Sequence, residues 1–91
     1  MPTLSIPSPL RSYTDGARSV DLQSTDVGGA IQELVTRYPA LNGHLFTDDG
    51  SLRPYVNLFL NDEDVRYLQG LETELGDKDK LKIIPSIAGG K

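Results

Sequence analysis

Two adjacent glycines, Gly89 and Gly90, are the residues of this sequence with the clearest chemical use. A carboxyl group on a Gly-Gly segment has almost no steric bulk around it, and the backbone there is free to adopt many conformations. Five residues beyond Pro85 would reach roughly 17 Å at full extension, which is enough to enter a channel in another protein. The sequence therefore predicts a flexible tail over residues 86–91 that a partner acts on. On composition alone, a chain end that is merely frayed has equal weight.

The other residue types with chemical potential give no catalytic arrangement. The chain contains no cysteine, so a disulfide, a thiolate zinc site and a cysteine nucleophile are all excluded. His44 is the only histidine and lies far in sequence from any serine that could form a triad with it. The sequence predicts that the chain is not an enzyme and binds no metal or cofactor of its own.

Asp62, Glu63 and Asp64 form the main acidic run. Such a run is most often a solvated turn at the end of a strand. The functional interpretation is that Asp62 and Glu63 steer the chain toward a basic rim on a partner. An acidic turn without further ligands is weak evidence for a metal site.

Composition limits the class of protein. The chain has 91 residues, of which 37% are hydrophobic and 24% charged, and this balance predicts a single globular domain. A formal net charge of -4 disfavours binding to nucleic acid or to anionic membrane. Residues 1–10 lack the pattern of a signal peptide, and no apolar run approaches the roughly 20 residues that span a bilayer. We expect a soluble, cytoplasmic protein.

The elements that must position the tail begin with a hairpin and a helix. Residues 3–6 and 19–22 alternate polar and apolar side chains, and the Asp15-Gly16 pair between them favours a tight turn with positive φ. An apolar stripe with helical spacing follows the candidate N-caps of residues 24–26. Pro39 disfavours a longer helix, so the pattern predicts a helix from about Asp26 to Tyr38.

The second half of the chain predicts two further strands. Residues 40–46 favour a short helical turn and residues 47–50 a reversal, after which Val56, Leu58 and Leu60 mark a central strand. Residues 61–64 are predicted to be an acidic turn and residues 71–76 an irregular segment. A last strand contains Leu81 and Ile83 and ends at Pro85. Packing one helix on a mixed sheet of four or five strands buries these stripes, which predicts an α+β, ubiquitin-like β-grasp fold over residues 1–85.

The same parity predicts a docking patch on the open face of the sheet. If Leu58, Leu60 and Ile83 face the helix, Phe59 and Ile84 must face away from it. Two large apolar side chains on an open face favour a contact with a partner. The alternative is that the segment over residues 40–55 covers them.

Three motifs in the second half of the chain resemble the MoaD/ThiS family of sulfur carriers. They are Asn61-Asp62-Glu63-Asp64-Val65-Arg66, the turn Gly76-Asp77-Lys78-Asp79, and Leu81-Lys82-Ile83-Ile84-Pro85-Ser86-Ile87-Ala88-Gly89-Gly90. The resemblance covers essentially the whole chain. Ser5-Ile6-Pro7 and Leu10-Arg11 are similar to the subgroup used in cysteine synthesis, the CysO type.

The resemblance implies a carrier that is activated by another protein. In this family an E1-like enzyme uses ATP to adenylate the carboxylate of the last glycine, here Gly90. Sulfur then displaces AMP and leaves a thiocarboxylate. The adenylating enzyme would hold Gly89 and Gly90 extended, with Ala88 also in contact with the partner. A sulfur-accepting synthase would take the sulfur, and cysteine synthesis is the favoured pathway.

Lys91 departs from the family pattern, because a chain in which it follows Gly90 has no free carboxylate to activate. The resemblance implies that a JAMM-type zinc peptidase removes Lys91. Lys91 as a remnant of expression, and a chain that is not a carrier, remain open.

Three other functions also remain open. The activated Gly90 could be joined to lysines, which would make the chain a ubiquitin-like protein modifier. The chain could be the small subunit of molybdopterin synthase, or a plain ubiquitin-like interaction module whose function does not depend on Gly90.

Overall fold

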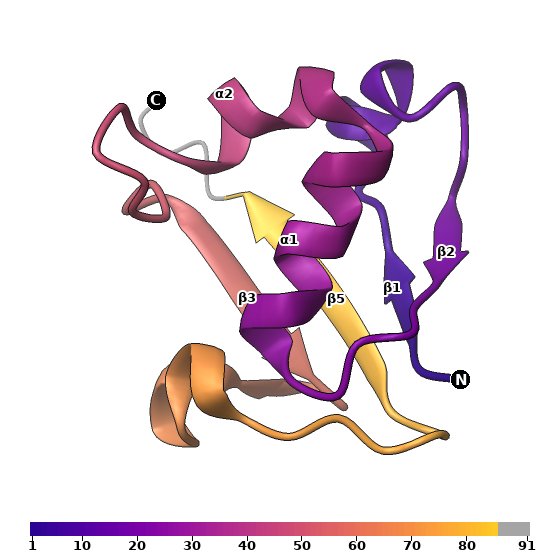
Figure 1. Cartoon of the computed structure of the whole chain (residues 1–91), viewed down its shortest axis with the longest axis vertical. Helices are drawn as coiled ribbons and strands as arrows, with labels where there is room; N and C mark the ends of the chain where they lie inside the picture. Colours follow the sequence, from indigo (N-terminus) through magenta and orange to yellow (C-terminus); the bar gives the residue numbers. More distant parts are fainter. Residues whose placement is uncertain (86–91) are drawn as a thin grey trace.

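The computed structural model describes residues 1–85, which form one five-stranded mixed sheet with a helix packed across one face (Figure 1). The order of the strands is β2-β1-β5-β3-β4. Their bounds are Thr3–Ser5 for β1, Ser19–Asp21 for β2, Val56–Leu60 for β3, Glu63–Asp64 for β4 and Lys80–Pro85 for β5. This is the predicted β-grasp fold. The predicted flexible tail, residues 86–91, lies outside the described residues.

β5 is the central strand of the sheet and pairs on both sides. It runs parallel to β1, with Leu4 opposite Leu81, and antiparallel to β3, with Leu58 opposite Ile83. The pairing with β3 continues to Pro85, which lies opposite Val56. The strand that leads into the tail is therefore held in the sheet up to its last residue.

The main helix, α1, spans Val27–Arg37 and confirms the predicted helix to within one residue at each end. Asp26 is the N-cap, and its Oδ1 accepts a hydrogen bond from the backbone N–H of Gly29 at 2.7 Å. The short helix α2, Asn42–Leu45, confirms the helical turn predicted after Pro39. Among residues 1–85, no helix is long and apolar enough to cross a membrane.

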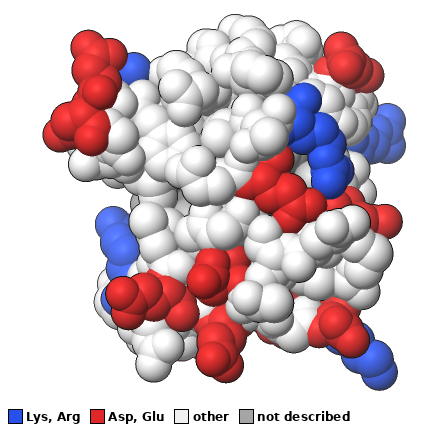
Figure 2. Space-filling view, in the orientation of Figure 1, with Lys and Arg blue, Asp and Glu red and all other residues white. Residues whose placement is uncertain are grey.

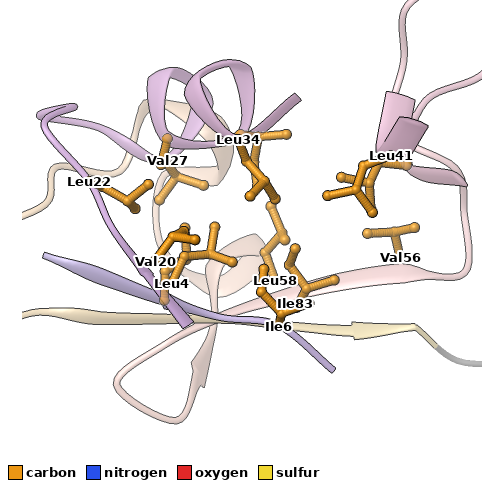
Figure 3. Close-up of a cluster of buried hydrophobic side chains, with 14 of the residues drawn as sticks. Leu4, Ile6, Val20, Leu22, Val27, Leu34, Leu41, Val56, Leu58 and Ile83 are labelled. Carbon is orange, nitrogen blue, oxygen red and sulfur yellow. The ribbon is translucent and has the colours of Figure 1, made fainter. Parts of the chain in front are cut away.

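The core lies between α1 and the face of the sheet that α1 covers (Figure 3). Leu4 and Ile83 on the sheet and Val27 and Leu34 on α1 are each at most 1% exposed. The alternating burial along β3 and β5 follows the predicted parity, with every second side chain buried. The apolar stripe of α1 and the period-two strands therefore meet as the sequence predicts.

The connection between β1 and β2 is more elaborate than the predicted hairpin. The two strands pair antiparallel as expected, with Leu4 opposite Val20, but a 3₁₀ helix occupies Ser8–Tyr13 between them. Proline in its first turn favours this helix, because the fixed φ of proline suits a helix start. Asp15 and Gly16 have φ values of 57° and 83°, which confirms the predicted positive-φ turn.

The turn predicted over residues 61–64 is shorter in the structure. Asn61 and Asp62 alone make the reversal, with φ values of 51° and 73°, and Glu63–Asp64 pairs back onto β3 as the short strand β4. A two-residue loop with both residues at positive φ matches the right-handed twist of the flanking strands, and Asn and Asp tolerate that conformation. The pattern of acidic residues conceals this strand in the sequence. Short 3₁₀ helices over Val65–Tyr67 and Gly70–Glu72 then lead toward β5.

Candidate functional site

The candidate site is the end of β5, because this strand ends four residues before Gly89 in the sequence. Leu81 and Ile83 are almost fully buried and fix the strand in the core. The predicted tail residues fall outside the described residues 1–85, namely Ala88, Gly89, Gly90 and Lys91. The structure therefore describes β5, the strand that precedes these residues in the sequence.

Two turns hold the start of β5. One follows β3 at Asn61, the other is Gly76-Asp77-Lys78-Asp79, and the two contact each other. Asn61 Nδ2 donates to Asp79 Oδ1 at 2.9 Å, and the backbone N–H of Lys80 donates to Asn61 Oδ1 at 3.0 Å. Asp79 Oδ2 also accepts from the backbone N–H of Gly76 at 2.7 Å. The Gly76 hydrogen bond, together with that from Asn61, lowers the pKa of Asp79 below its usual 3.8. These motif residues therefore set the register of β5.

One member of the acidic run, Asp64, is closely paired with a cation. Asp64 is only 7% exposed, and its Oδ2 lies 2.6 Å from the Arg66 guanidinium. The side-chain hydrogen bond from Arg66 lowers the pKa of Asp64. Asp62 Oδ1 lies 3.8 Å from Lys82 Nζ, whereas Glu63 is exposed and has no ion-pair partner among the described residues. The predicted steering role of Asp62 and Glu63 stays a prediction.

The predicted docking residues lie on the open face of the sheet, as their parity requires. Ile84 is 41% exposed and lies opposite Asn57, while Phe59 is half-buried and lies opposite Lys82. The segment over residues 40–55 leaves Ile84 exposed. Lys80 and Lys82 point to the same face by the alternation of β5. The face is therefore a mixed apolar and basic surface whose role in binding stays a prediction.

The opposite face of the molecule has a different charge. Figure 2, seen from the side of α1, shows acidic side chains spread over this face and basic side chains mainly at its margins. Among the described residues, no group of three or more His, Asp or Glu side chains could hold a metal ion. A basic partner surface would fit the α1 side better than the sheet side.

A recess at the end of β5 is a feature that the sequence analysis missed. It encloses about 200 Å³ and is lined by Pro9, Leu10, Tyr13, His44, Leu45, Tyr55, Val56 and Pro85. The ring centroids of Tyr13 and His44 are 4.2 Å apart. No local pattern could reveal this recess, because its walls come from the 3₁₀ helix Ser8–Tyr13, from α2 and from the starts and ends of two strands.

Comparison with known proteins places these features in a family. The model of the ThiS family matches residues 4–90, which include Gly89 and Gly90. The sulfur carrier protein CysO of Mycobacterium tuberculosis is 39% identical over 90 residues, covering 97% of each chain. Small archaeal modifier protein 3 of Haloferax volcanii is 38% identical over 64 residues, covering 70% of this chain and 68% of the relative.

Solved structures agree with this placement. In the crystal structure of the BexX/CysO complex of Amycolatopsis orientalis, a chain that is 38% identical superposes with a TM-score of 0.86. The superposition covers 99% of this chain and 100% of the other. The shared β-grasp fold, the central β5 and the matched Gly-Gly segment lead to one conclusion: the chain belongs to the ThiS family.

Proposed function

We propose that this protein is a sulfur carrier that is activated at the carboxylate of Gly90. The observation that carries the proposal is the extent of the family match, which runs through β5 to Gly90. A sheet that holds β5 as far as Pro85 supports this role, because it gives the residues beyond a fixed starting point. The 39% identity to a protein named sulfur carrier CysO, over almost the whole chain, supports it further.

The chemistry of the proposal has two steps on the partner enzyme. A carboxylate oxygen of Gly90 attacks the α-phosphorus of ATP. The bond from the α-phosphorus to the bridging oxygen breaks, and pyrophosphate leaves. A hydrosulfide equivalent then attacks the Gly90 carbonyl, a C–S bond forms, and AMP leaves with the carboxyl oxygen. The adenylate makes the acyl carbon electrophilic, so the carrier supplies the acyl group and the E1-like enzyme supplies the catalysis.

The proposal requires that Lys91 be removed first. Water must cleave the Gly90–Lys91 peptide bond, which releases Lys91 and leaves the Gly90 carboxylate. A JAMM-type zinc peptidase is the class of enzyme that we infer for this step. A sulfur-accepting synthase, for which cysteine synthesis is the favoured pathway, then transfers the sulfur to its acceptor. Water attacks the acyl carbon as the C–S bond breaks, which restores the Gly90 carboxylate.

Exchange of labelled pyrophosphate into ATP tests the activation step. Residues 1–90 should support exchange by the E1-like adenylating enzyme, because they end in a free Gly90 carboxylate. Two matched chains should support none: the 91-residue chain, and residues 1–90 with Gly90→Trp, whose side chain obstructs a narrow channel. Equal exchange by all three chains would contradict the proposal.

A protein modifier is the second candidate, favoured by the 38% identity to a chain named small archaeal modifier protein 3. In that case a lysine amine, in place of sulfur, attacks the Gly90 adenylate and forms an isopeptide bond as AMP leaves. Covalent conjugates larger than the free chain would then appear in cells, and Gly90→Trp would abolish them. The molybdopterin synthase subunit stays an alternative for the pathway that receives the sulfur.

A further inference from the structure

The recess at the end of β5 lies where the chain leaves the sheet. Pro85, the last described residue, forms part of its wall together with Val56, its partner on β3. Gly90 is five residues beyond Pro85, so it stays within roughly 17 Å of that wall even when fully extended. An enzyme that holds Gly90 in its active site must therefore bring its own surface close to this end of the sheet.

The chemistry of the walls selects an apolar occupant. The lining residues of this recess include no Lys, Arg, Asp or Glu. In contrast, the recess beside Leu52 contains Arg53 and Arg66, and the recess beside Asn61 contains three lysines. A charged group would lose hydration in the uncharged recess without gaining a counter-ion. An apolar or aromatic side chain would bear no such loss of hydration.

The aromatic rim has the composition of a binding anchor. Tyr13 is 37% exposed and Tyr55 is 43% exposed, so both rings keep surface that a partner could bury. Tyrosine is enriched among the few interface residues that contribute most of the binding energy, because its ring is large and rigid. The stacking of His44 on Tyr13 holds one side of the rim in place.

We propose that this recess binds an apolar side chain of the E1-like adenylating enzyme, beside the channel that receives the tail. The inference rests on the proposed function, and it adds a second contact that is independent of the Gly-Gly segment. The recess holds the carrier while the tail extends into the active site. Because this contact forms equally in the ground state and in the transition state, its loss should raise KM and leave kcat nearly unchanged.

Pyrophosphate exchange with residues 1–90 tests the inference. Tyr55→Ala should raise the KM for the carrier about 10-fold or more, because it removes an aromatic anchor. Tyr55→Phe keeps the ring and should stay within about twofold of the wild type. Tyr67→Ala is the matched control, since Tyr67 is 80% exposed and belongs to the 3₁₀ helix at the other end of β3.

Each outcome decides the matter. A KM for Tyr55→Ala equal to that of Tyr67→Ala overturns the proposal. A lower KM also overturns it, because the recess would then oppose binding of the enzyme. Exchange that fails with the wild-type chain contradicts the proposed function and this inference together, whereas normal wild-type exchange with an unchanged Tyr55→Ala contradicts this inference alone.

A second variant tests the recess in case Tyr55→Ala does not fold. His44→Ala removes the ring that packs on Tyr13 and should raise KM by a smaller factor than Tyr55→Ala. His44 is exposed on α2, so its removal costs little packing. Thermal unfolding of each variant should match the wild type, and a KM effect that appears only in an unstable variant counts against the recess.

Discussion

The side chain of Asn61 connects the turn after β3 to Asp79, eighteen residues further along the chain. Its amide nitrogen donates to the Asp79 carboxylate at 2.9 Å, and its amide oxygen accepts from the backbone of Lys80 at 3.0 Å. The two contacts join the residue that follows β3 to the start of β5. Because Lys80 is the first residue of β5, this pair anchors the start of that strand.

Removing the Asp79 carboxylate should destabilise the fold. Asp79→Ala loses the hydrogen bonds from Gly76 and Asn61 and should lower the free energy of unfolding by about 1–2 kcal/mol. Asp77→Ala, in the same exposed turn, makes a matched control and should change it by less than about 0.5 kcal/mol. Urea unfolding followed by circular dichroism measures both. Equal effects would show that the Asp79 contacts do not support β5.

Stability should fall in acid. The folded-state pKa values of Asp79 and Asp64 lie below the usual 3.8, because hydrogen bonds and Arg66 favour the charged carboxylates. Their contribution is therefore fully present above the unfolded-state pKa, about 4, and is lost as the pH falls through the lower folded-state values. Urea unfolding between about pH 2 and pH 6 should show this loss. Asp79→Asn should flatten the slope, and a slope identical to the wild type would refute the assignment.

Two helical glycines should respond oppositely to alanine. A Cβ on Gly29 would lie 2.9 Å from Asp26 Oδ1, the oxygen that caps α1, whereas a Cβ on Gly43 in α2 would meet nothing within 4 Å. Gly43→Ala should stabilise by about 0.4–1 kcal/mol. Gly29→Ala should give no gain and a loss of up to about 1 kcal/mol, because the cap must shift. Thermal unfolding compares them, and an equal gain at both sites would contradict this account of the cap.

The open sheet face gives a prediction that is separate from the recess. Ile84→Ser replaces an exposed apolar side chain and should raise the KM of the adenylating enzyme or of the synthase by about 3- to 10-fold. Thr3→Ala, on β1 but on the same face of the sheet, serves as the control. Unfolding curves that match the wild type would confirm that the effect is on binding. If neither enzyme responds to Ile84→Ser, the predicted docking patch on this face is wrong.

The local patterns of the sequence were enough to predict the main elements. The stripe from Val27 onward depends only on helical spacing and on Asp26 as a cap, and it predicts α1 almost to the residue. The parity of β3 and β5 predicts the directions of Phe59 and Ile84 for the same reason. These features follow from neighbours within a few positions of each other.

Features that no local apolar pattern marks were not predictable in this way. β4 forms only because Asn61 and Asp62 both adopt positive φ, which turns an apparent acidic loop into a hairpin. The recess needs Tyr13, Tyr55 and Pro85 to come together through the packing of three separate segments. The ion pair between Asp64 and Arg66 likewise neutralises one carboxylate of the acidic run, and the sequence analysis did not assign it.

Intact-protein mass spectrometry of the chain from its native cell tests most directly whether the carboxylate of Gly90 carries sulfur. We expect a species that lacks Lys91 and is about 16 Da heavier than residues 1–90, because sulfur replaces one carboxyl oxygen. Sulfur demand should increase it, and Gly90→Trp should abolish it. A chain that retains Lys91, with no sulfur adduct under sulfur demand, would contradict the carrier function.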